Sequence, residues 1–258
     1  MSYIGLRLSS SLLLAVSVAG CVSTGAEDDL DVSGDASGVA VPGRFELFRA
    51  ADRQYYFTFE SGQGEILLYS EGYEGRTGAL NGILSVLDNG DATARYVVRE
   101  ADDGLSYAHL RAANGHVVAS SAGYLSYDEA FAVIPAASGA VAGYNDDWSS
   151  RTGARFEVFP GADYKYYFRL YAANGQQVLR SQSYATEASA LNGAFAVAEY
   201  AGDPAAFTIT ESASGGFYFN VRAPNNETIA TSEVYSTKAS AERARDSIIA
   251  LLPKVELL

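Results

Sequence analysis

Large apolar and polar positions alternate along this chain in one pattern that occurs four times. Each occurrence begins with an aromatic residue and continues with a second aromatic residue, a serine and a later tyrosine. Separations of 51, 60 and 51 residues relate each of these landmarks in successive segments. A fixed period of this length indicates tandem copies of one structural unit of about fifty residues. The landmarks are Phe45, Tyr96, Phe156 and Phe207; Tyr56, Tyr107, Tyr167 and Tyr218; Ser70, Ser121, Ser181 and Ser232; and Tyr73, Tyr124, Tyr184 and Tyr235.

Within each unit the pattern predicts three short strands followed by one helix. In the third unit, residues 156–159 form a first strand, and residues 166–171 alternate large and polar side chains as a half-buried second strand does. The fourth unit has the clearest helix, because Ser236 or Thr237 can cap its start and apolar residues follow at helical spacing through Leu252. The helices are expected to begin near Thr77, Asp128, Ala188 and Ala239.

A short loop joins the second and third strands of every unit. A three-residue loop that ends in a residue with positive φ fits all four copies. That residue is glycine in three units and asparagine, which also tolerates this conformation, in the fourth. The positions are Gly64, Gly115, Gly175 and Asn226. The resulting register predicts the apolar cross-strand pairs Phe59–Leu67, Leu110–Val118, Leu170–Val178 and Val221–Ile229.

The second unit departs from this pattern at its helix. Pro135 should stop that helix early, and the stretch that follows is rich in Gly, Ser and Asp and contains Trp148. We interpret residues 142–153 as a linker between two domains. One unit offers only a marginal core, so the units are expected to pair, giving domains at residues 43–141 and 154–258.

The first 42 residues have a different composition. Residues 1–20 combine an early positive charge, an apolar stretch and small residues, which is the layout of a secretory signal peptide. The run Val18-Ala19-Gly20-Cys21 resembles the bacterial lipobox, and Cys21 is the single cysteine of the chain. This resemblance implies cleavage before Cys21 and its lipidation, which anchors the mature chain to a membrane. The alternative is an ordinary cleaved signal peptide.

Residues 21–42 are rich in Ser, Gly, Ala and acidic residues and contain no basic residue. Such a segment cannot bury a core, so we expect a disordered tether behind the lipidated cysteine. Val22, and not Asp, follows the cysteine, which favours the outer membrane of a bacterial cell envelope as the location.

Composition narrows the functional classes. The chain has 258 residues, of which 48% are hydrophobic and 19% charged, as in globular proteins. The formal net charge of −13 argues against a nucleic-acid partner, because the phosphate backbone repels an acidic surface. One cysteine permits neither an intrachain disulfide nor a thiolate metal cluster.

Several runs carry a family resemblance. They are Tyr167-Phe168-Arg169-Leu170, Ala172 and Asn174-Gly175; Ser70-Glu71-Gly72-Tyr73 and Asn81-Gly82-Ile83-Leu84-Ser85-Val86; and Ser232-Glu233, Tyr235 and Lys238-Ala239-Ser240-Ala241. Together they resemble the YegP-like repeat, an uncharacterised bacterial domain that brings no established activity. The resemblance covers all four units, but Ala132-Val133 stands where Asn-Gly is expected, and Arg76, Tyr127 and Glu187 replace Lys238 in the other units.

The resemblance implies an α+β fold. Four β-β-β-α(-β) repeats pair into two YegP-like domains, each a mainly antiparallel sheet with helices packed on one face. Two repeats are expected to exchange their last strands, and residues 254–258 would supply one of these strands.

Catalytic motifs are missing from the sequence. It contains no Gly-x-Ser-x-Gly elbow, His-Glu-x-x-His motif, phosphate loop or dinucleotide fingerprint. His109 and His116 lie on one hairpin without a recurring third ligand, so we favour surface histidines over a metal site. The run Asp88-Asn89-Gly90-Asp91 is interpreted as a helix stop instead of a calcium loop. No cofactor and no metal are expected, and an enzyme is the least favoured function.

The polar face of the second strand points to a function. Alternation places tyrosine and arginine there, the residue types that binding surfaces favour. We predict a lipid-anchored, non-catalytic binding or structural module that binds an envelope glycan or a partner protein through this face. The alternatives are that tyrosine, a good strand former, packs structurally, and that the chain is a scaffold that pairs through its sheet edges. The candidate residues are Tyr56, Tyr107, Arg111, Tyr167, Arg169, Tyr171, Tyr218 and Arg222.

Overall fold

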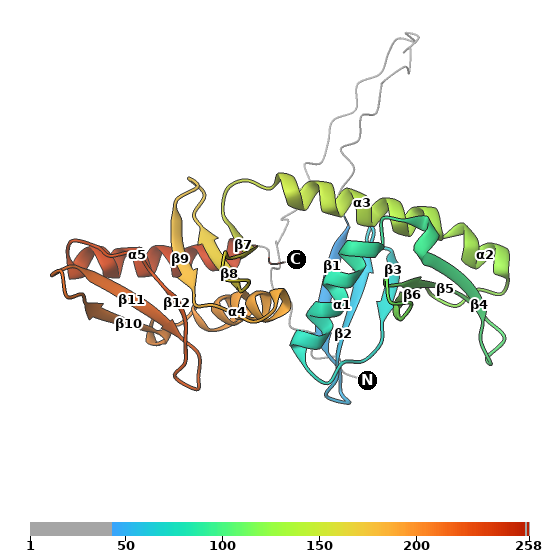
Figure 1. The fold of residues 1–258 in the computed structure, drawn as a ribbon, viewed down its shortest axis with the longest axis horizontal. Coiled ribbons are helices and arrows are strands. Elements are labelled where there is room, and N and C mark those ends of the chain that lie inside the picture. The colour runs from blue at the N-terminus through green and yellow to red at the C-terminus, as the bar shows by residue number, and fades with distance from the viewer. Residues whose placement is uncertain (1–42, 256, 258) are drawn as a thin grey trace, which may run out of the picture.

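A computed structural model describes residues 43–255 and residue 257, which fold into two six-stranded antiparallel sheets with helices packed against them (Figure 1). The α+β fold predicted above is therefore confirmed. The first sheet and its helices comprise β1 (Arg44–Arg49), β2 (Tyr55–Glu60), β3 (Ile66–Ser70), α1 (Arg76–Asn89), β4 (Tyr96–Glu100), β5 (Ser106–Arg111), β6 (Val117–Ser120), α2 (Tyr127–Ala132) and α3 (Ile134–Ser150). The second comprises β7 (Arg155–Pro160), β8 (Tyr166–Tyr171), β9 (Gln177–Ser181), α4 (Glu187–Tyr200), β10 (Phe207–Glu211), β11 (Phe217–Arg222), β12 (Thr228–Thr231) and α5 (Lys238–Leu251).

Two units join in each sheet through their third strands. The strand orders are β1-β2-β3-β6-β5-β4 and β10-β11-β12-β9-β8-β7. The central contact is antiparallel and pairs Tyr69 with Ser120 in the first sheet and Arg180 with Thr231 in the second. Each unit would otherwise leave the edge of its third strand unpaired, and joining two units satisfies both edges at once.

The expected exchange of last strands is not seen in residues 43–255. After its third strand each unit makes a single bridge back to the second strand, as between Tyr73 and Tyr55, and then enters its helix. Leu252–Lys254 forms a short 3-10 helix instead of starting a last strand. Direct pairing of the third strands already completes each sheet, so the described structure needs no exchanged strand.

The core lies between each sheet and its helices. Alternate residues of the second strands point toward the helices and are at most 1% exposed, as the strand period of two requires. These residues are Phe57, Phe59, Ala108, Leu110, Phe168, Leu170, Phe219 and Val221.

The loop between the second and third strands has the predicted conformation, but the register beyond it is shifted by one residue. Gly64, Gly115, Gly175 and Asn226 have φ values of 84°, 83°, 79° and 68°. In the first unit Glu60 pairs with Ile66 as the loop predicts, whereas Phe59 pairs with Leu68 and not with Leu67. A β-bulge causes this shift, because the inserted residue Leu67 has no partner of its own. The predicted pairs Leu110–Val118, Leu170–Val178 and Val221–Ile229 are wrong for the same reason.

The helix of the second unit ends early, as Pro135 predicts, but a second helix follows at once. α2 stops at Ala132, and α3 begins at Ile134 with Pro135 in its first turn, where the missing N–H costs no hydrogen bond. α3 continues to Ser150, so most of the predicted linker, residues 142–153, is helical.

Apolar residues at helical spacing explain why α3 forms across a stretch rich in Gly, Ser and Asp. Val141 and Tyr144 are 0% and 1% exposed and face the first sheet. The ring of Tyr144 packs edge-on against Phe45 and Phe59, with ring centres 5.3 and 6.1 Å away. This buried stripe outweighs the low helix propensity of the intervening residues.

The two sheets contact each other through α1 and α4 (Figure 1). Arg76, at the start of α1, donates a hydrogen bond from Nε to Asn192 Oδ1 at 2.6 Å and pairs with Glu199 at 3.0 Å. At the opposite end, the pKa of Glu187 is raised, first by burial and then by the charge of Asp88. The start of each helix thus lies near the end of the other, so the two helices run antiparallel.

Residues 1–42, which contain the predicted signal peptide, Cys21 and the tether, lie outside the described residues. Among those described, no helix has the length and hydropathy needed to cross a membrane. α1 ends at Asn89, where the helix stop was predicted, and the Asn89 amide donates to the carbonyl of Ser85 at 2.8 Å.

Candidate binding face

Each sheet has one face covered by helices and an opposite face, called here the open face, that carries the polar positions of its strands. The cross-strand register places one row of side chains across the middle of each open face. The row of the first sheet is Glu46, Thr58, Tyr69, Ser120, His109 and Val97. The equivalent row of the second sheet is Glu157, Arg169, Arg180, Thr231, Asn220 and Thr208.

The candidate residues all lie on the open faces, divided between the two sheets. In the first sheet they sit on β2 and β5, which β3 and β6 separate; in the second they sit on β8 and β11, separated by β9 and β12. All of them are half-buried. The first sheet holds Tyr56, Tyr107 and Arg111, and the second holds Tyr167, Arg169, Tyr171, Tyr218 and Arg222.

The second residue of each second strand is a tyrosine, and within residues 43–255 three of these four, Tyr56, Tyr107 and Tyr167 but not Tyr218, have a structural partner. Tyr167 donates its hydroxyl hydrogen bond to Asp163 at 2.8 Å, and Asp163 also accepts from the backbone of Lys165 in the turn between β7 and β8. This hydrogen bond raises the pKa of Tyr167 and lowers that of Asp163. Tyr56 and Tyr107 make the same contact with Asp52 and Asp103. These hydroxyls therefore help to fix the turns, and their rings are what remains available on the face.

Arginines and aromatic rings alternate on the open face of the third unit. The guanidinium of Arg169 lies 3.9 Å from the ring centre of Phe159, and its Nη1 donates to the Tyr171 hydroxyl at 3.4 Å. Phe159 stacks on Tyr167, and the guanidinium of Arg180 lies 5.9 Å from the Tyr167 ring centre. We call this set the arginine–aromatic ladder, and it consists of Arg155, Tyr171, Arg169, Phe159, Tyr167 and Arg180.

The open face of the first sheet has a different character. Glu60 is 6% exposed there and pairs with Arg44 at 2.6 Å, which closes one end of the face. A shallow depression of about 450 Å³ lies near the middle and is lined by His109, Ser120 and Tyr69, among others. Its mixed polar lining contains no cluster of His, Cys, Asp or Glu fit to hold a metal ion, nor does any other part of residues 43–255.

His109 and Ser120 contact each other in this depression. Nδ1 of His109 lies 2.7 Å from the Ser120 hydroxyl oxygen. Burial lowers the pKa of His109, the charges of Arg111 and Arg99 lower it further, and Glu71 opposes them. The imidazole is therefore neutral near pH 7.

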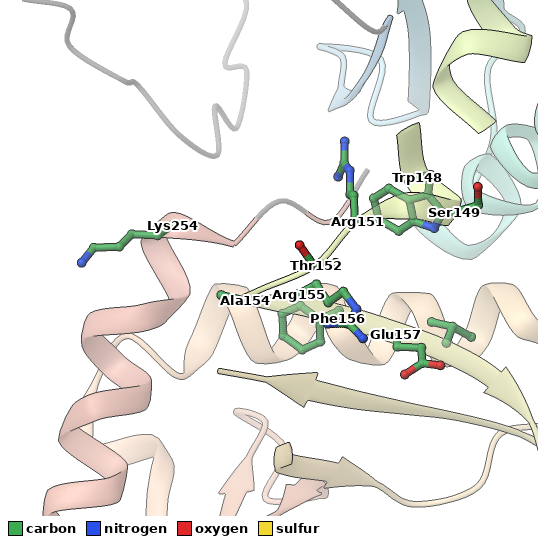
Figure 2. Close-up of a pocket in the computed structure, with 10 residues that line it drawn as sticks. Trp148, Ser149, Arg151, Thr152, Ala154, Arg155, Phe156, Glu157 and Lys254 are labelled. Carbon is green, nitrogen blue, oxygen red and sulfur yellow. The ribbon is translucent and has the colours of Figure 1, made fainter. Parts of the chain in front are cut away.

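A second cavity of about 450 Å³ lies between α3 and β7, at the boundary of the two sheets (Figure 2). Trp148 and Arg151 line it from the end of α3, and Arg155 lines it from β7. Arg151 pairs with Asp147 and lies 4.5 Å from the ring centre of Trp148. Arg155 also stacks over Tyr171, so this cavity adjoins the end of the arginine–aromatic ladder.

Sequence reasoning missed Arg180, Tyr69 and Ser120 as members of the open faces. If side chains alternated between the two faces without interruption after the loop, these residues would lie on the buried face. The β-bulge inserts one residue before them, so their side chains lie on the open face. A sequence signal was present, because two successive apolar residues precede each of these positions.

The comparisons with known proteins identify a family. The sequence profile of the family described as "Domain of unknown function (DUF1508)" matches residues 50–96, 162–207 and 212–256, which together exceed half of the chain. The chain belongs to this family. The matched segments of the DUF1508 family fall in the first, third and fourth units. Membership of the second unit, which has the unusual helix, stays a prediction.

Relatives of the family are similar to part of this chain. A UPF0339 protein of Shewanella oneidensis is 39% identical over 84 residues, 33% of this chain and 76% of the relative. The UPF0339 protein YegP of Escherichia coli K12 is 40% identical over 82 residues, 32% of this chain and 74% of the relative. The solution NMR structure of the protein of unknown function yegP from E. coli covers 40% of this chain and 88% of its own, with 29% identity and a TM-score of 0.37.

Proposed function

We propose that this DUF1508-family chain is a non-catalytic binding module of the bacterial cell envelope, and that the open face of its second sheet binds an extended glycan. The observation that carries the proposal is the arginine–aromatic ladder. Tyrosine and arginine are enriched where binding energy concentrates, and both combine stacking with hydrogen bonding. A broad sheet face suits a polymer, which spreads its contacts over several residues.

The pattern of cross-strand pairs supports a non-catalytic role. The His109–Ser120 contact has its counterpart in the second sheet, where the hydroxyl of Thr231 donates to Oδ1 of Asn220 at 2.8 Å. The Asn220 amide cannot act as a general base. The residue pair at this position therefore serves a cross-strand hydrogen bond, which requires no proton transfer. Ser120 is the last residue of β6 and does not lie in the first turn of a helix, where free backbone N–H groups could supply an oxyanion site.

The envelope location is part of the proposal and follows from the sequence. The signal-like residues 1–20 and the lipobox-like run at Cys21 support a lipid anchor, at the outer membrane because Val22 follows the cysteine. The acidic residues 21–42 would then hold the two sheets away from the membrane surface. Labelling of cells with a radioactive fatty acid tests the anchor, since incorporation should be lost in Cys21→Ser.

A sedimentation assay tests glycan binding. The full chain, purified in mild detergent, is mixed with isolated cell-wall and surface-polysaccharide fractions and centrifuged. We expect saturable co-sedimentation that falls about tenfold in Tyr171→Ala, since an aromatic anchor typically contributes 1–2 kcal/mol.

Tyr164→Ala is the matched control for this assay. Tyr164 is 94% exposed in the turn between β7 and β8, so its loss removes an aromatic ring from the same domain without altering the open face. Equal binding by both variants would place the site elsewhere. Absence of binding to every fraction would exclude glycan binding and favour a scaffold for envelope proteins, to be sought by crosslinking in cells.

A further inference from the structure

Two arginines of the ladder stand directly opposite each other on neighbouring strands. Arg169 on β8 and Arg180 on β9 are cross-strand partners on the open face of the second sheet. Within residues 43–255 and 257, neither guanidinium forms an ion pair. Glu157 on β7 lies in the same row and is the cross-strand neighbour of Arg169, but its carboxylate forms no ion pair with that guanidinium. Two like charges placed opposite each other repel and lower stability.

The fold itself does not require this pair. In the first sheet the equivalent partners are Thr58 and Tyr69, which carry no charge and occupy the same register between the second and third strands. The two remaining units place His109 opposite Ser120 and Asn220 opposite Thr231. The arginine pair is therefore specific to the third unit, although it costs stability and the chain as a whole is acidic.

The aromatic rings hold the two guanidinium groups in place. Phe159 lies under the guanidinium of Arg169, with its ring centre 3.9 Å away, and the Tyr167 ring lies beside the guanidinium of Arg180 at 5.9 Å. A stacked guanidinium keeps its N–H donors in its own plane, where they can reach an acceptor. Nε of Arg169 is buried and has no hydrogen-bond partner. The site thus presents two positive charges that no carboxylate of the described residues neutralises, and the hydrogen bond that the pair makes within these residues runs from Arg169 Nη1 to Tyr171.

We propose that Arg169 and Arg180 bind the carboxylate groups of an acidic polysaccharide, which makes the glycan ligand a polyanion. This inference rests on the proposed function and specifies its ligand class. A carboxylate between the two guanidinium groups would cancel their repulsion and form charge-assisted hydrogen bonds. The rings of Phe159, Tyr167 and Tyr171 flank the pair and suit a chain of sugar rings that carry acidic groups. Arg155 extends the positive charge along the face toward Trp148 and the cavity of Figure 2.

Binding of defined polymers to the full chain in mild detergent tests this proposal. The probes are polygalacturonate, an acidic glycan; dextran, a neutral glycan; and poly-L-glutamate, an acidic peptide. We expect binding to polygalacturonate that weakens as salt is added, and much weaker binding to dextran. Arg180→Gln should weaken polygalacturonate binding about tenfold or more, the effect of losing one charged hydrogen-bonding group.

Two further measurements separate the site from general charge effects. Arg243→Gln removes the same charge from an exposed position on α5, away from the open face, and should leave binding unchanged. Arg180→Gln should not lower the melting temperature of the free protein, because it relieves the repulsion from Arg169. A loss of binding caused only by misfolding would lower that temperature.

The outcomes distinguish this inference from the proposed function. Equal binding of dextran and polygalacturonate, insensitive to Arg180→Gln, would overturn the acidic preference and leave glycan binding intact. Equal losses of binding in Arg243→Gln and Arg180→Gln would show that binding depends only on net charge. That result would overturn the assignment of the site to Arg169 and Arg180. Binding of poly-L-glutamate alone would overturn both the acidic-glycan inference and the proposed glycan binding, in favour of an acidic protein partner. Absence of binding to all three probes would overturn the acidic-glycan inference. The sedimentation assay with envelope fractions would then decide the proposed function.

Discussion

The serine at the end of the third strand performs the same task in all four units. In the third unit, Ser181 accepts a hydrogen bond from the backbone N–H of Phe168 at 2.8 Å and donates to the carbonyl of Gln182 at 2.7 Å. Its hydroxyl replaces a backbone partner where the chain leaves the sheet. An unsatisfied N–H at this buried position would cost about 1–3 kcal/mol. The repeated Ser-x-x-Tyr motif is thus explained by the architecture.

The half-buried imidazole of His109 makes stability depend on pH. Its pKa lies below the ordinary value of 6.5 in the folded chain, so the unfolded chain binds a proton first as the pH falls. Protonation therefore favours unfolding, and the stability that the neutral imidazole contributes is complete above pH 6.5 and is lost below it.

Replacing His109 by asparagine should remove this dependence, because Asn220 fills the equivalent position of the fourth unit. Between pH 7 and pH 5, the melting temperature of the wild type should fall further than that of His109→Asn. The two chains should respond alike between pH 7 and pH 8, which serves as the control. Parallel curves down to pH 5 would contradict the lowered pKa.

At the scale of elements, a glycine inside a helix decides how closely α4 approaches its sheet. Tyr184 stacks on Phe168 with ring centres 6.2 Å apart, and a Cβ on Gly193 would collide with both rings. α4 cannot move away, because α1 packs on its other side. The fourth unit has Ala244 at the equivalent position, where the opposite side of α5 is exposed to solvent and the helix is free to sit further out.

Gly193→Ala should therefore destabilise the chain by about 1–3 kcal/mol, the usual cost of overpacking, although alanine is the better helix former. Gly143→Ala in α3 is the matched control, since nothing lies within 4 Å of its added Cβ. That variant should stabilise the chain by about 0.5–1 kcal/mol. Chemical denaturation of both variants measures the difference, and changes of the same sign would refute this account of Gly193.

At the scale of the whole molecule, the contact between α1 and α4 joins the two sheets. Arg76 makes the principal polar contacts of this interface with Asn192 and Glu199, and its guanidinium lies 5.7 Å from the ring centre of Phe195. α4 is buried on both sides and consists largely of small residues, which allows the two helices to approach closely.

Arg76→Glu should loosen this contact without weakening α1, because an acidic residue suits the start of a helix. We expect a loss of about 1 kcal/mol and faster amide hydrogen exchange in α4, since the new carboxylate faces Glu199. Lys238→Glu is the matched control at the same position of α5, where Lys238 is exposed. Unchanged exchange in α4 would show that Arg76 does not hold the two sheets together.

The repeat and its local structure could be predicted from the sequence because they depend on neighbouring residues. Helix starts, the positive-φ loop positions and the alternation of the second strands all follow from spacing and residue type. The third strands were assigned to the wrong face because a bulge at Leu67 and its equivalents inserts one residue; the loop conformation does not require this bulge, and its one sequence signal is the pair of successive apolar residues. Arg180 was missed for this reason, although it is central to the proposed site.

By itself, the sequence determined the four-unit pattern, the α+β class and the presence of tyrosine and arginine on the second strands. These properties follow from period, turn residues and side-chain type, which act over a few positions. Only the tertiary structure decided that Arg169 faces Arg180, that α3 replaces a linker and that α1 packs on α4. Each of these results depends on contacts between residues distant in sequence or on a register shift, which local spacing does not encode.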